Sequence, residues 1–129
     1  MKLLLDTQAF LWFVLNDARL SPAARTLLVD PANELLFSPA SYWEIAIKVH
    51  LGKWTLAQPY PDLIDSLWTV YGFQVLPILP AHTARLIGLP DHHRDPFDRL
   101  LIAQALAEGL TIVGTDVVFD QYGVLRLWV

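Results

Sequence analysis

Short, nearly continuous apolar runs alternate along the chain with longer stretches in which apolar residues recur at helical spacing. Such short runs are typical of strands that are covered on both faces of a parallel sheet. They predict strands at residues 2–5, 34–37, 73–78, 110–113 and 125–128.

The longer stretches begin and end at residues that favour helix termini. A serine or aspartate followed by proline supplies an N-cap and a first helical residue with the required backbone angle. Three helices are expected to begin at such pairs, which are Ser21-Pro22, Ser38-Pro39 and Asp95-Pro96. Gly52 and Gly109 suit the left-handed position that follows a helix. Further helices are predicted at residues 7–15, 61–71 and 80–88, and a helical turn at 116–122.

Strands that alternate with helices predict βαβ units and therefore a mostly parallel sheet. The chain has 129 residues, which is the length of one domain. We expect an α/β fold: a single three-layer domain over residues 1–129, with four or five strands flanked by helices. Sheets of this kind bind ligands beyond the carboxyl ends of their strands.

Composition excludes several classes of protein. Hydrophobic residues make up 54% of the chain and charged residues 17%, which excludes intrinsic disorder. The longest apolar run, residues 9–15, is far shorter than the ~20 residues of a membrane span. Asp6 interrupts the apolar start too early for a signal peptide, and the absence of cysteine excludes disulfides and thiolate sites. These features fit a cytoplasmic protein.

Four acidic side chains are expected at the carboxyl edge of the predicted sheet. Asp6 ends the first strand and Asp116 follows the fourth. Asp98 lies in the first turn of the helix before the fourth strand, and Glu44 lies two turns into the helix after the second. If the sheet is parallel, these four carboxylates converge on one cleft.

Clustered carboxylates repel one another unless protons or a cation offset their charge. Mg²⁺ prefers oxygen ligands, and such ions activate water and neutralise phosphodiesters. A bound cation would also explain how a chain with a net charge of −4 binds a polyanion, since nucleic-acid-binding proteins are usually basic. The pattern therefore predicts metal-dependent hydrolysis of a phosphodiester.

Each acid also has a simpler structural interpretation. Asp6 and Asp116 can cap the helical segments that follow them, and Asp98 can complete a capping box. Glu44 can pair with Lys48 at the favoured i,i+4 spacing. A parallel sheet places every such cap on one edge, so convergence alone leaves both interpretations open.

Four segments match a known family in the same order along the chain. They are Leu3-Leu4-Leu5-Asp6-Thr7 with Leu11-Trp12, residues 41–48, residues 93–105 and residues 111–124. Together they resemble the PIN-domain ribonucleases, specifically the VapC-type toxins of bacterial and archaeal toxin–antitoxin pairs. The third segment, His-Arg-Asp-Pro-Phe-Asp-Arg-Leu-Leu-Ile-Ala-Gln-Ala, is the most specific.

The resemblance implies a parallel α/β fold and endonucleolytic cleavage of RNA that depends on Mg²⁺ or Mn²⁺. It also implies inhibition by a cognate antitoxin protein, and family members commonly form homodimers. By motif, the catalytic and metal-binding role falls to Asp6, Glu44, Asp98 and Asp116. A metal-activated water would attack the phosphate, so no side chain needs to act as a covalent nucleophile.

The closing motif departs from the family pattern at one position. The family often has threonine two residues before the last acid, with its hydroxyl near the metal. Here Gly114 occupies that place and Thr115 stands in the middle, which leaves the hydroxyl contribution open. Thr115 is therefore a candidate substrate contact.

A polar segment precedes the helix that contains Asp98. Arg94 or Arg99 can hold a phosphate through two N–H groups, and Arg94 is the preferred candidate substrate contact. Asp95 is interpreted as an N-cap. Metal ligation by His92 or His93 is not expected, because the pair lacks the usual spacing of zinc-binding histidines.

Two further classes of function stay open at this stage. The same fold and acids would suit a metal-dependent DNA nuclease. If the acids serve only as caps and ion pairs, the chain is a catalytically silent RNA-binding or protein-interaction module. Trp12, Phe13 and Trp54 are candidates for a groove that holds an antitoxin segment or a second copy of the chain.

Overall fold

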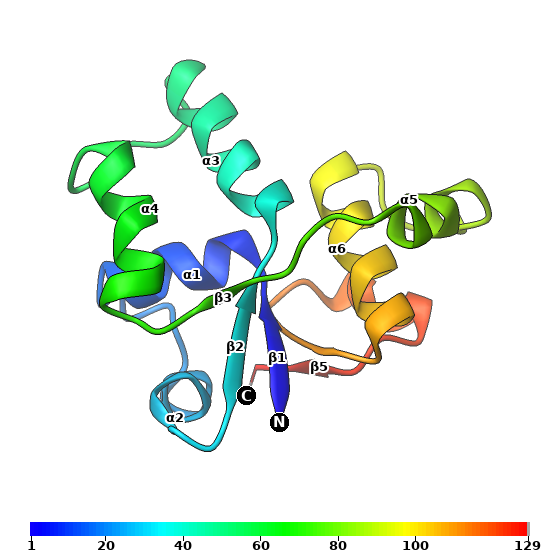
Figure 1. The fold of residues 1–129 in the computed structure, drawn as a ribbon, viewed down its shortest axis with the longest axis horizontal. Helices are drawn as coiled ribbons and strands as arrows, with labels where there is room; N and C mark the ends of the chain where they lie inside the picture. The colour runs from blue at the N-terminus through cyan, green and yellow to red at the C-terminus, as the bar shows by residue number, and fades with distance from the viewer. Residues whose placement is uncertain (129) are drawn as a thin grey trace.

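Five strands form one parallel sheet in the computed structural model, which describes residues 1–128 (Figure 1). The strands are β1 (Lys2–Leu5), β2 (Glu34–Phe37), β3 (Gln74–Val75), β4 (Thr111–Val113) and β5 (Arg126–Leu127). Their order across the sheet is β3-β2-β1-β4-β5, and every neighbouring pair is parallel. The expectation of an α/β fold with a mostly parallel sheet is confirmed.

The helices begin where the capping residues predict. Ser21, Ser38 and Asp95 each accept a backbone N–H of the helix that follows, and Gly109 ends the sixth helix with a φ of 67°. The helices are α1 (Thr7–Val14), α2 (Pro22–Val29), α3 (Pro39–His50), α4 (Tyr60–Thr69), α5 (Pro80–Ile87), α6 (Pro96–Glu108) and the 3₁₀ helix η1 (Val117–Tyr122). Among the described residues, no helix combines the length and the apolar character needed to cross a membrane.

The sheet separates two hydrophobic layers. Leu3 and Leu5 of β1 point to the side that α1, α2, α3 and α4 cover. Leu4 points to the opposite side, where it packs with residues of α6 and with Phe119 of η1. All three leucines are fully buried, as expected for a strand at the centre of a sheet covered on both faces. Figure 1 shows the same division, with α1 to α4 on one side of β1 and α5 and α6 on the other.

The third strand is shorter than predicted. Residues 73–78 are apolar enough for a longer strand, but only Gln74 and Val75 pair with β2 in strand geometry. Pro77 lacks a backbone N–H and cannot extend the ladder, which explains why the segment leaves the sheet after Leu76. The fifth strand likewise covers only Arg126 and Leu127 of the predicted 125–128.

The strand order places a topological switch beside β1. The chain passes from β1 to β2 and β3 on one side, then returns to β4 and β5 on the other. A crevice forms at the carboxyl ends of the two strands where such an order reverses, and ligands bind there. In this protein those strands are β1 and β4, which are followed by Asp6 and by the segment that leads to Asp116.

Candidate metal and active site

Asp6 is positioned directly at the switch between β1 and β4. Its backbone N–H donates to the carbonyl of Val113 over 3.0 Å, which extends the strand pairing by one residue. Its carboxylate then turns toward α1, where Oδ1 accepts the N–H of Gln8 over 3.4 Å. Asp6 is therefore also a helix cap, and it is only 8% exposed.

Gly114 allows the end of β4 to approach Asp6 closely. A β-carbon at residue 114 would lie 2.9 Å from the β-carbon of Asp6 and 3.0 Å from Oδ2. A threonine, as in the usual family motif, therefore does not fit unless Asp6 moves. Thr115 is exposed and lines the same cavity as Asp6, so a hydroxyl does reach this region from the neighbouring position.

Glu44 approaches from α3 and is 4% exposed. Its Oε2 lies 2.6 Å from Nζ of Lys48, so the ion pair predicted from the spacing is present. Lys48 in turn lies 4.5 Å from the ring centroid of Trp54. Oε1 of Glu44 is buried without a hydrogen-bond partner among the described residues. The ion pair thus provides a hydrogen-bond partner for only one of the two oxygens of this buried carboxylate.

Asp98 lies in the first turn of α6, but it does not complete a capping box. Asp95 caps the helix: its Oδ1 accepts the N–H of Phe97 over 2.8 Å and that of Asp98 over 3.1 Å. In a capping box the carboxylate of Asp98 would accept the N–H of Asp95, which instead donates to Nδ1 of His93 over 3.2 Å. The carboxylate of Asp98 is therefore not used to cap the helix.

Asp116 and Asp98 meet at His93. Oδ1 of Asp116 accepts the N–H of Val118 over 3.0 Å, which makes Asp116 the cap of η1. Its Oδ2 lies 2.8 Å from Nε2 of His93, and Oδ2 of Asp98 lies 3.1 Å from the same nitrogen. The potential ligand atoms of these three side chains all lie within 4.8 Å of one another.

His93 reaches the site although its place in the sequence does not predict this. Its separation from Asp98 and Asp116 along the chain matches no spacing typical of metal-binding histidines. The available signal was its position two residues before the N-cap Asp95, at the start of the most specific motif. That position is where a loop meets the amino end of α6, at the same edge as the carboxylates.

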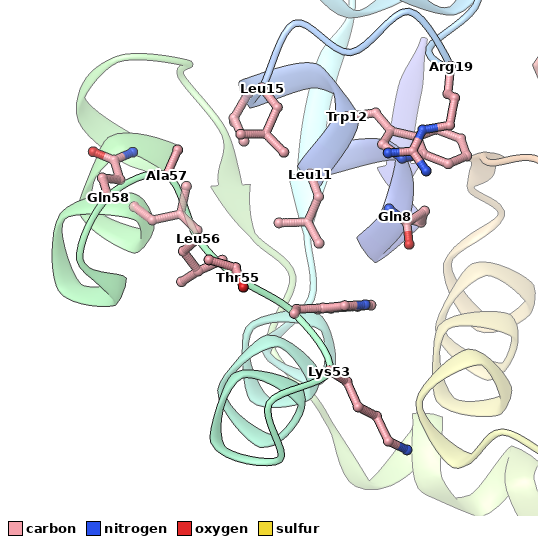
Figure 2. Close-up of a pocket in the computed structure, with 13 residues that line it drawn as sticks. Gln8, Leu11, Trp12, Leu15, Arg19, Lys53, Thr55, Leu56, Ala57 and Gln58 are labelled. Atoms are coloured by element: carbon pink, nitrogen blue, oxygen red, sulfur yellow. The ribbon is translucent and has the colours of Figure 1, made fainter.

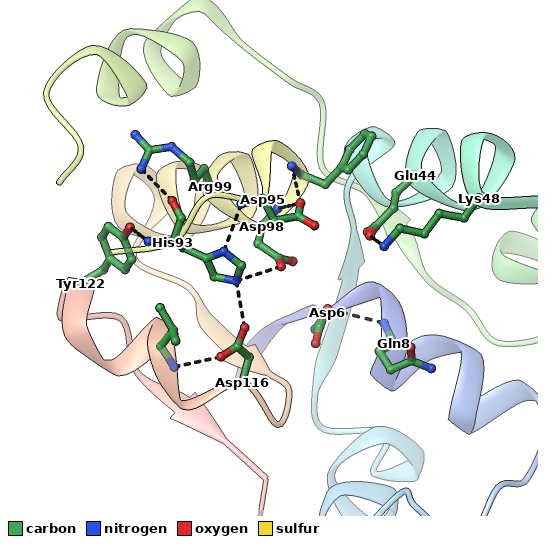
Figure 3. A network of polar contacts seen from close by, with 12 residues as sticks. Asp6, Gln8, Glu44, Lys48, His93, Asp95, Asp98, Arg99, Asp116 and Tyr122 are labelled. Atoms are coloured by element: carbon green, nitrogen blue, oxygen red, sulfur yellow. Dashed lines mark hydrogen bonds and ion pairs between the residues drawn. The ribbon is translucent and has the colours of Figure 1, made fainter. Parts of the chain in front are cut away.

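The predicted acids share one open cavity of about 220 Å³. Figure 3 shows Asp6 between the pair Glu44 and Lys48 on one side and Asp98 and Asp116 on the other. The cavity is lined by Asp6, Thr7, Gln8, Glu44, Lys48, Trp54, Asp95, Asp98, Thr115 and Asp116. Thr7, one of these residues, donates to Ser41 over 2.9 Å, and this buried hydrogen bond joins α1 to α3. The structure thus brings together all four acids that the sequence singles out.

The electrostatics of the cavity favour a cation. Burial, and after it the nearby carboxylates of Asp6, Asp95, Glu44 and Asp116, raise the pKa of Asp98 to about 8. The pKa of Asp6 rises to about 7, mainly through burial and also through Glu44 and Asp116, although the N–H of Gln8 opposes part of the rise. Close carboxylates that resist ionisation are stabilised when a divalent ion offsets their charge.

The donor set fits a hard divalent cation. Asp6, Glu44, Asp98 and Asp116 offer only carboxylate oxygens, which Mg²⁺ and Mn²⁺ prefer. Oε1 of Glu44 is a buried acceptor that still lacks a partner within residues 1–128. These side chains could therefore hold such an ion.

The two arginines near the site differ in their availability. Arg99 donates to the carbonyls of Leu89, Pro90 and His93 over 2.9–3.2 Å. Its guanidinium is therefore committed to the loop and is not available to grip a phosphate. Arg94 is exposed, and it forms no ion pair within residues 1–128.

Comparisons of the sequence with known proteins found both a family and a relative. A family model described as "PIN domain" matches residues 3–125. Ribonuclease VapC22 of Mycobacterium tuberculosis is 30% identical over 114 residues, which cover 88% of this chain and 85% of that protein.

Solved structures share the fold at low sequence identity. A structure of VapBC2 from Rickettsia felis, bound to a promoter DNA fragment, superposes with a TM-score of 0.74 at 15% identity over all of both chains. VapBC-1 from nontypeable Haemophilus influenzae gives a TM-score of 0.69 at 18% identity, covering 98% of this chain and 97% of that chain. The expected resemblance to VapC proteins is thus confirmed, and the chain belongs to the PIN domain family.

Proposed function

We propose that this protein is an endoribonuclease that depends on Mg²⁺ or Mn²⁺ and acts as the toxin of a toxin–antitoxin pair. The observation that supports this most strongly is the unpartnered Oε1 of Glu44 in a cavity shared with Asp6, Asp98 and Asp116. A buried carboxylate oxygen without a donor costs free energy that a bound cation would recover. Membership of the PIN family and the relative named as a ribonuclease support the same function.

The proposed roles follow from the position of each side chain. Asp6, Glu44, Asp98 and Asp116 would hold the cation through their carboxylate oxygens. The cation, when bound, would supply Lewis-acid chemistry and offset the negative charge of a phosphodiester. The hydrogen bonds that Asp6 and Asp116 accept from Gln8 and Val118 keep these two carboxylates in place before a substrate arrives.

Three further side chains would act on the substrate. Lys48 adds a positive charge to the cavity wall, where it attracts a phosphate that approaches the carboxylates. Thr115 offers a hydroxyl at the same wall. Arg94 is exposed next to the cap of α6 and is proposed to contact a neighbouring phosphate of the RNA.

The proposed antitoxin site is a cavity of about 270 Å³ beside the carboxylate site. Figure 2 shows Gln8, Leu11 and Trp12 of α1, and Leu15 just after it, across from the segment at residues 53–58. Gln8 and Trp54 line both this cavity and the carboxylate cavity, so a bound segment could cover both. The VapBC complexes among the structures with the same fold support an antitoxin partner.

The domain organisation, the compartment and the oligomeric state of the protein are also proposed. Residues 1–129 are proposed to work as a single PIN-like domain, in the cytoplasm and as a homodimer. Exposed apolar side chains such as Trp43, at 60% exposure, provide surface that a second copy could cover. Sedimentation of the purified chain in the absence of an antitoxin measures the oligomeric state directly.

The test of the function begins with the cation. Calorimetric titration of Mn²⁺ into the wild type should show saturable binding that Asp6→Asn with Asp98→Asn abolishes. The same two proteins are then incubated with RNA and with DNA of equal sequence. Cleavage of RNA by the wild type but not by the double variant supports the proposal. Cleavage of DNA and not of RNA supports a DNA nuclease. Absence of cation binding and of cleavage in the wild type supports a binding module instead.

A further inference from the structure

His93 contacts two of the proposed cation ligands from outside the cavity. Its Nε2 lies 2.8 Å from Oδ2 of Asp116 and 3.1 Å from Oδ2 of Asp98. Among the described residues, the cavity wall includes Asp98 and Asp116 but not His93. In Figure 3 the ring lies on the far side of these two carboxylates from Asp6 and Glu44. The imidazole therefore touches these two carboxylates from outside the cavity that the four acids share.

The hydrogen bonds of the ring determine which nitrogen is the donor. Nδ1 of His93 accepts the backbone N–H of Asp95 over 3.2 Å. An imidazole nitrogen that accepts a hydrogen bond has no proton, so the ring proton is on Nε2. Nε2–H donates to Oδ2 of Asp116, and Oδ2 of Asp98 lies close enough to share that donor.

The loop that presents His93 is anchored by two side chains of other elements. The hydroxyl of Tyr122 accepts the backbone N–H of His93 over 2.7 Å and donates to the carbonyl of Pro90 over 2.8 Å. Arg99 donates to the carbonyls of Leu89, Pro90 and His93. These bonds hold the backbone at both ends of residues 89–93, so the ring has a defined place beside the carboxylates.

We propose that His93 is a positioning residue of the carboxylate site, whose Nε2–H holds Asp98 and Asp116 together in readiness for a divalent cation. This inference rests on the function proposed above. Two neighbouring carboxylates repel one another, and a shared donor behind them offsets part of that repulsion. Hydrogen bonds to metal ligands orient them, and their loss typically weakens metal binding by about 10–100-fold.

Two substitutions distinguish the role of the ring as a hydrogen-bond donor from its role as an acceptor. His93→Gln retains an N–H near the position of Nε2 but loses the acceptor for Asp95. His93→Asn retains an acceptor near the position of Nδ1 but loses the donor to the carboxylates. The affinity of each full-length chain for Mn²⁺ is measured by calorimetry, with His50→Gln, at an exposed histidine of α3, as the control.

If the inference is correct, the Mn²⁺ affinity depends on whether the side chain at residue 93 retains an N–H donor to the carboxylates. His93→Asn should weaken Mn²⁺ binding about tenfold or more, whereas His93→Gln should stay within about threefold of the wild type. His50→Gln should leave the affinity unchanged. Thermal melting in a chelator establishes that each variant folds. If His93→Asn does not fold, Tyr122→Phe is used instead, since it releases the loop without altering the ring, and it should weaken Mn²⁺ binding.

The other outcomes each contradict the inference. A role for His93 in the loop alone predicts the reverse order, with normal affinity in His93→Asn and weak affinity in His93→Gln. A ring that competes with the cation predicts tighter binding in both variants. Equal affinities in all variants, Tyr122→Phe included, overturn the inference but leave the proposed function intact. A wild type that binds no Mn²⁺ overturns both.

Discussion

The side chain of Asp6 leaves no room for a side chain at Gly114, where a β-carbon would lie 2.9 Å from the β-carbon of Asp6. Real side chains do not approach one another this closely, so any other residue at 114 must displace Asp6 or the end of β4. The glycine therefore does more than remove the hydroxyl that the usual motif supplies. It sets how near β4 comes to the first of the four acids.

Gly114→Ala is expected to weaken both folding and cation binding. The added methyl group should lower the free energy of unfolding by about 1–3 kcal/mol, as overpacking usually does. It should also weaken Mn²⁺ binding, because Asp6 is the side chain that must move. Urea unfolding and calorimetry measure the two effects. Gly88→Ala is the control, since nothing lies within 4 Å of a β-carbon there, and equal losses in both variants would contradict the argument.

The stability of the cation-free protein should depend on pH through Asp6 and Asp98. Both have an ordinary pKa of 3.8 in the unfolded chain, and in the folded protein burial raises the pKa of Asp6 to about 7 and that of Asp98 to about 8. Between these values the folded protein holds protons that the unfolded chain has released. The resulting stabilisation is complete below about pH 4 and is lost as the pH rises to about 8.

Urea unfolding in a chelator between about pH 5 and 8 measures this decline. Asp98→Asn should flatten it, and Asp62→Asn, at an exposed position of α4, should not. Added Mn²⁺ should stabilise the protein most at the alkaline end of the range, because the ion must displace protons at lower pH. A stabilisation by Mn²⁺ that is the same at both ends would contradict the assignment of these carboxylates.

The sequence was sufficient for the features that depend on strand ends and helical spacing. Asp6 directly follows a strand and Asp116 comes three residues after one, so a parallel sheet alone brings them to one edge. The four-residue spacing of Glu44 and Lys48 predicts their ion pair, which is present at 2.6 Å. The capping and catalytic interpretations of Asp6 and Asp116 also prove compatible, because each side chain accepts a capping N–H and lines the cavity.

The remaining features depend on tertiary contacts that spacing does not encode. His93 reaches the site because Tyr122 and Arg99, from two other elements, hold its loop. The exclusion of a capping box at Asp98 depends on the same loop, since Nδ1 of His93 takes the N–H of Asp95. The requirement for glycine at 114 becomes visible only when β4 lies beside Asp6.

Lys48→Met is expected to destabilise the cation-free protein. Glu44 is buried, and Lys48 is its only hydrogen-bond partner among the described residues. A buried carboxylate left without a partner costs about 1–3 kcal/mol in a urea unfolding experiment. Glu44→Gln in the same chain should recover most of that loss. Lys53→Met, at an exposed lysine nearby, is the control. An equally large loss of stability in that variant would show that the Glu44–Lys48 pair contributes little.

Trp54→Ala is expected to weaken antitoxin binding more than folding. Trp54 is partly buried and lines both the carboxylate cavity and the neighbouring cavity, so a segment bound across them would contact it. The partner to use is the protein that co-purifies with this chain from its own cells and suppresses its cleavage of RNA. Calorimetry gives the affinity and thermal melting the stability. Leu56→Ala in the same cavity is the matched comparison, and unchanged affinity in both variants would exclude this cavity as the antitoxin site.

Arg94 and Arg99 should respond differently to substitution, although both lie near the amino end of α6. Arg94→Ala removes an exposed side chain and should leave stability unchanged while raising the KM for an oligoribonucleotide. Arg99→Ala removes the donor of three loop carbonyls and should lower the free energy of unfolding by about 1–3 kcal/mol. Steady-state cleavage and urea unfolding of both variants test this division. If Arg94→Ala cleaves RNA with an unchanged KM, the phosphate contact does not come from this residue, and Lys48 and Thr115 remain as the substrate contacts at the cavity wall.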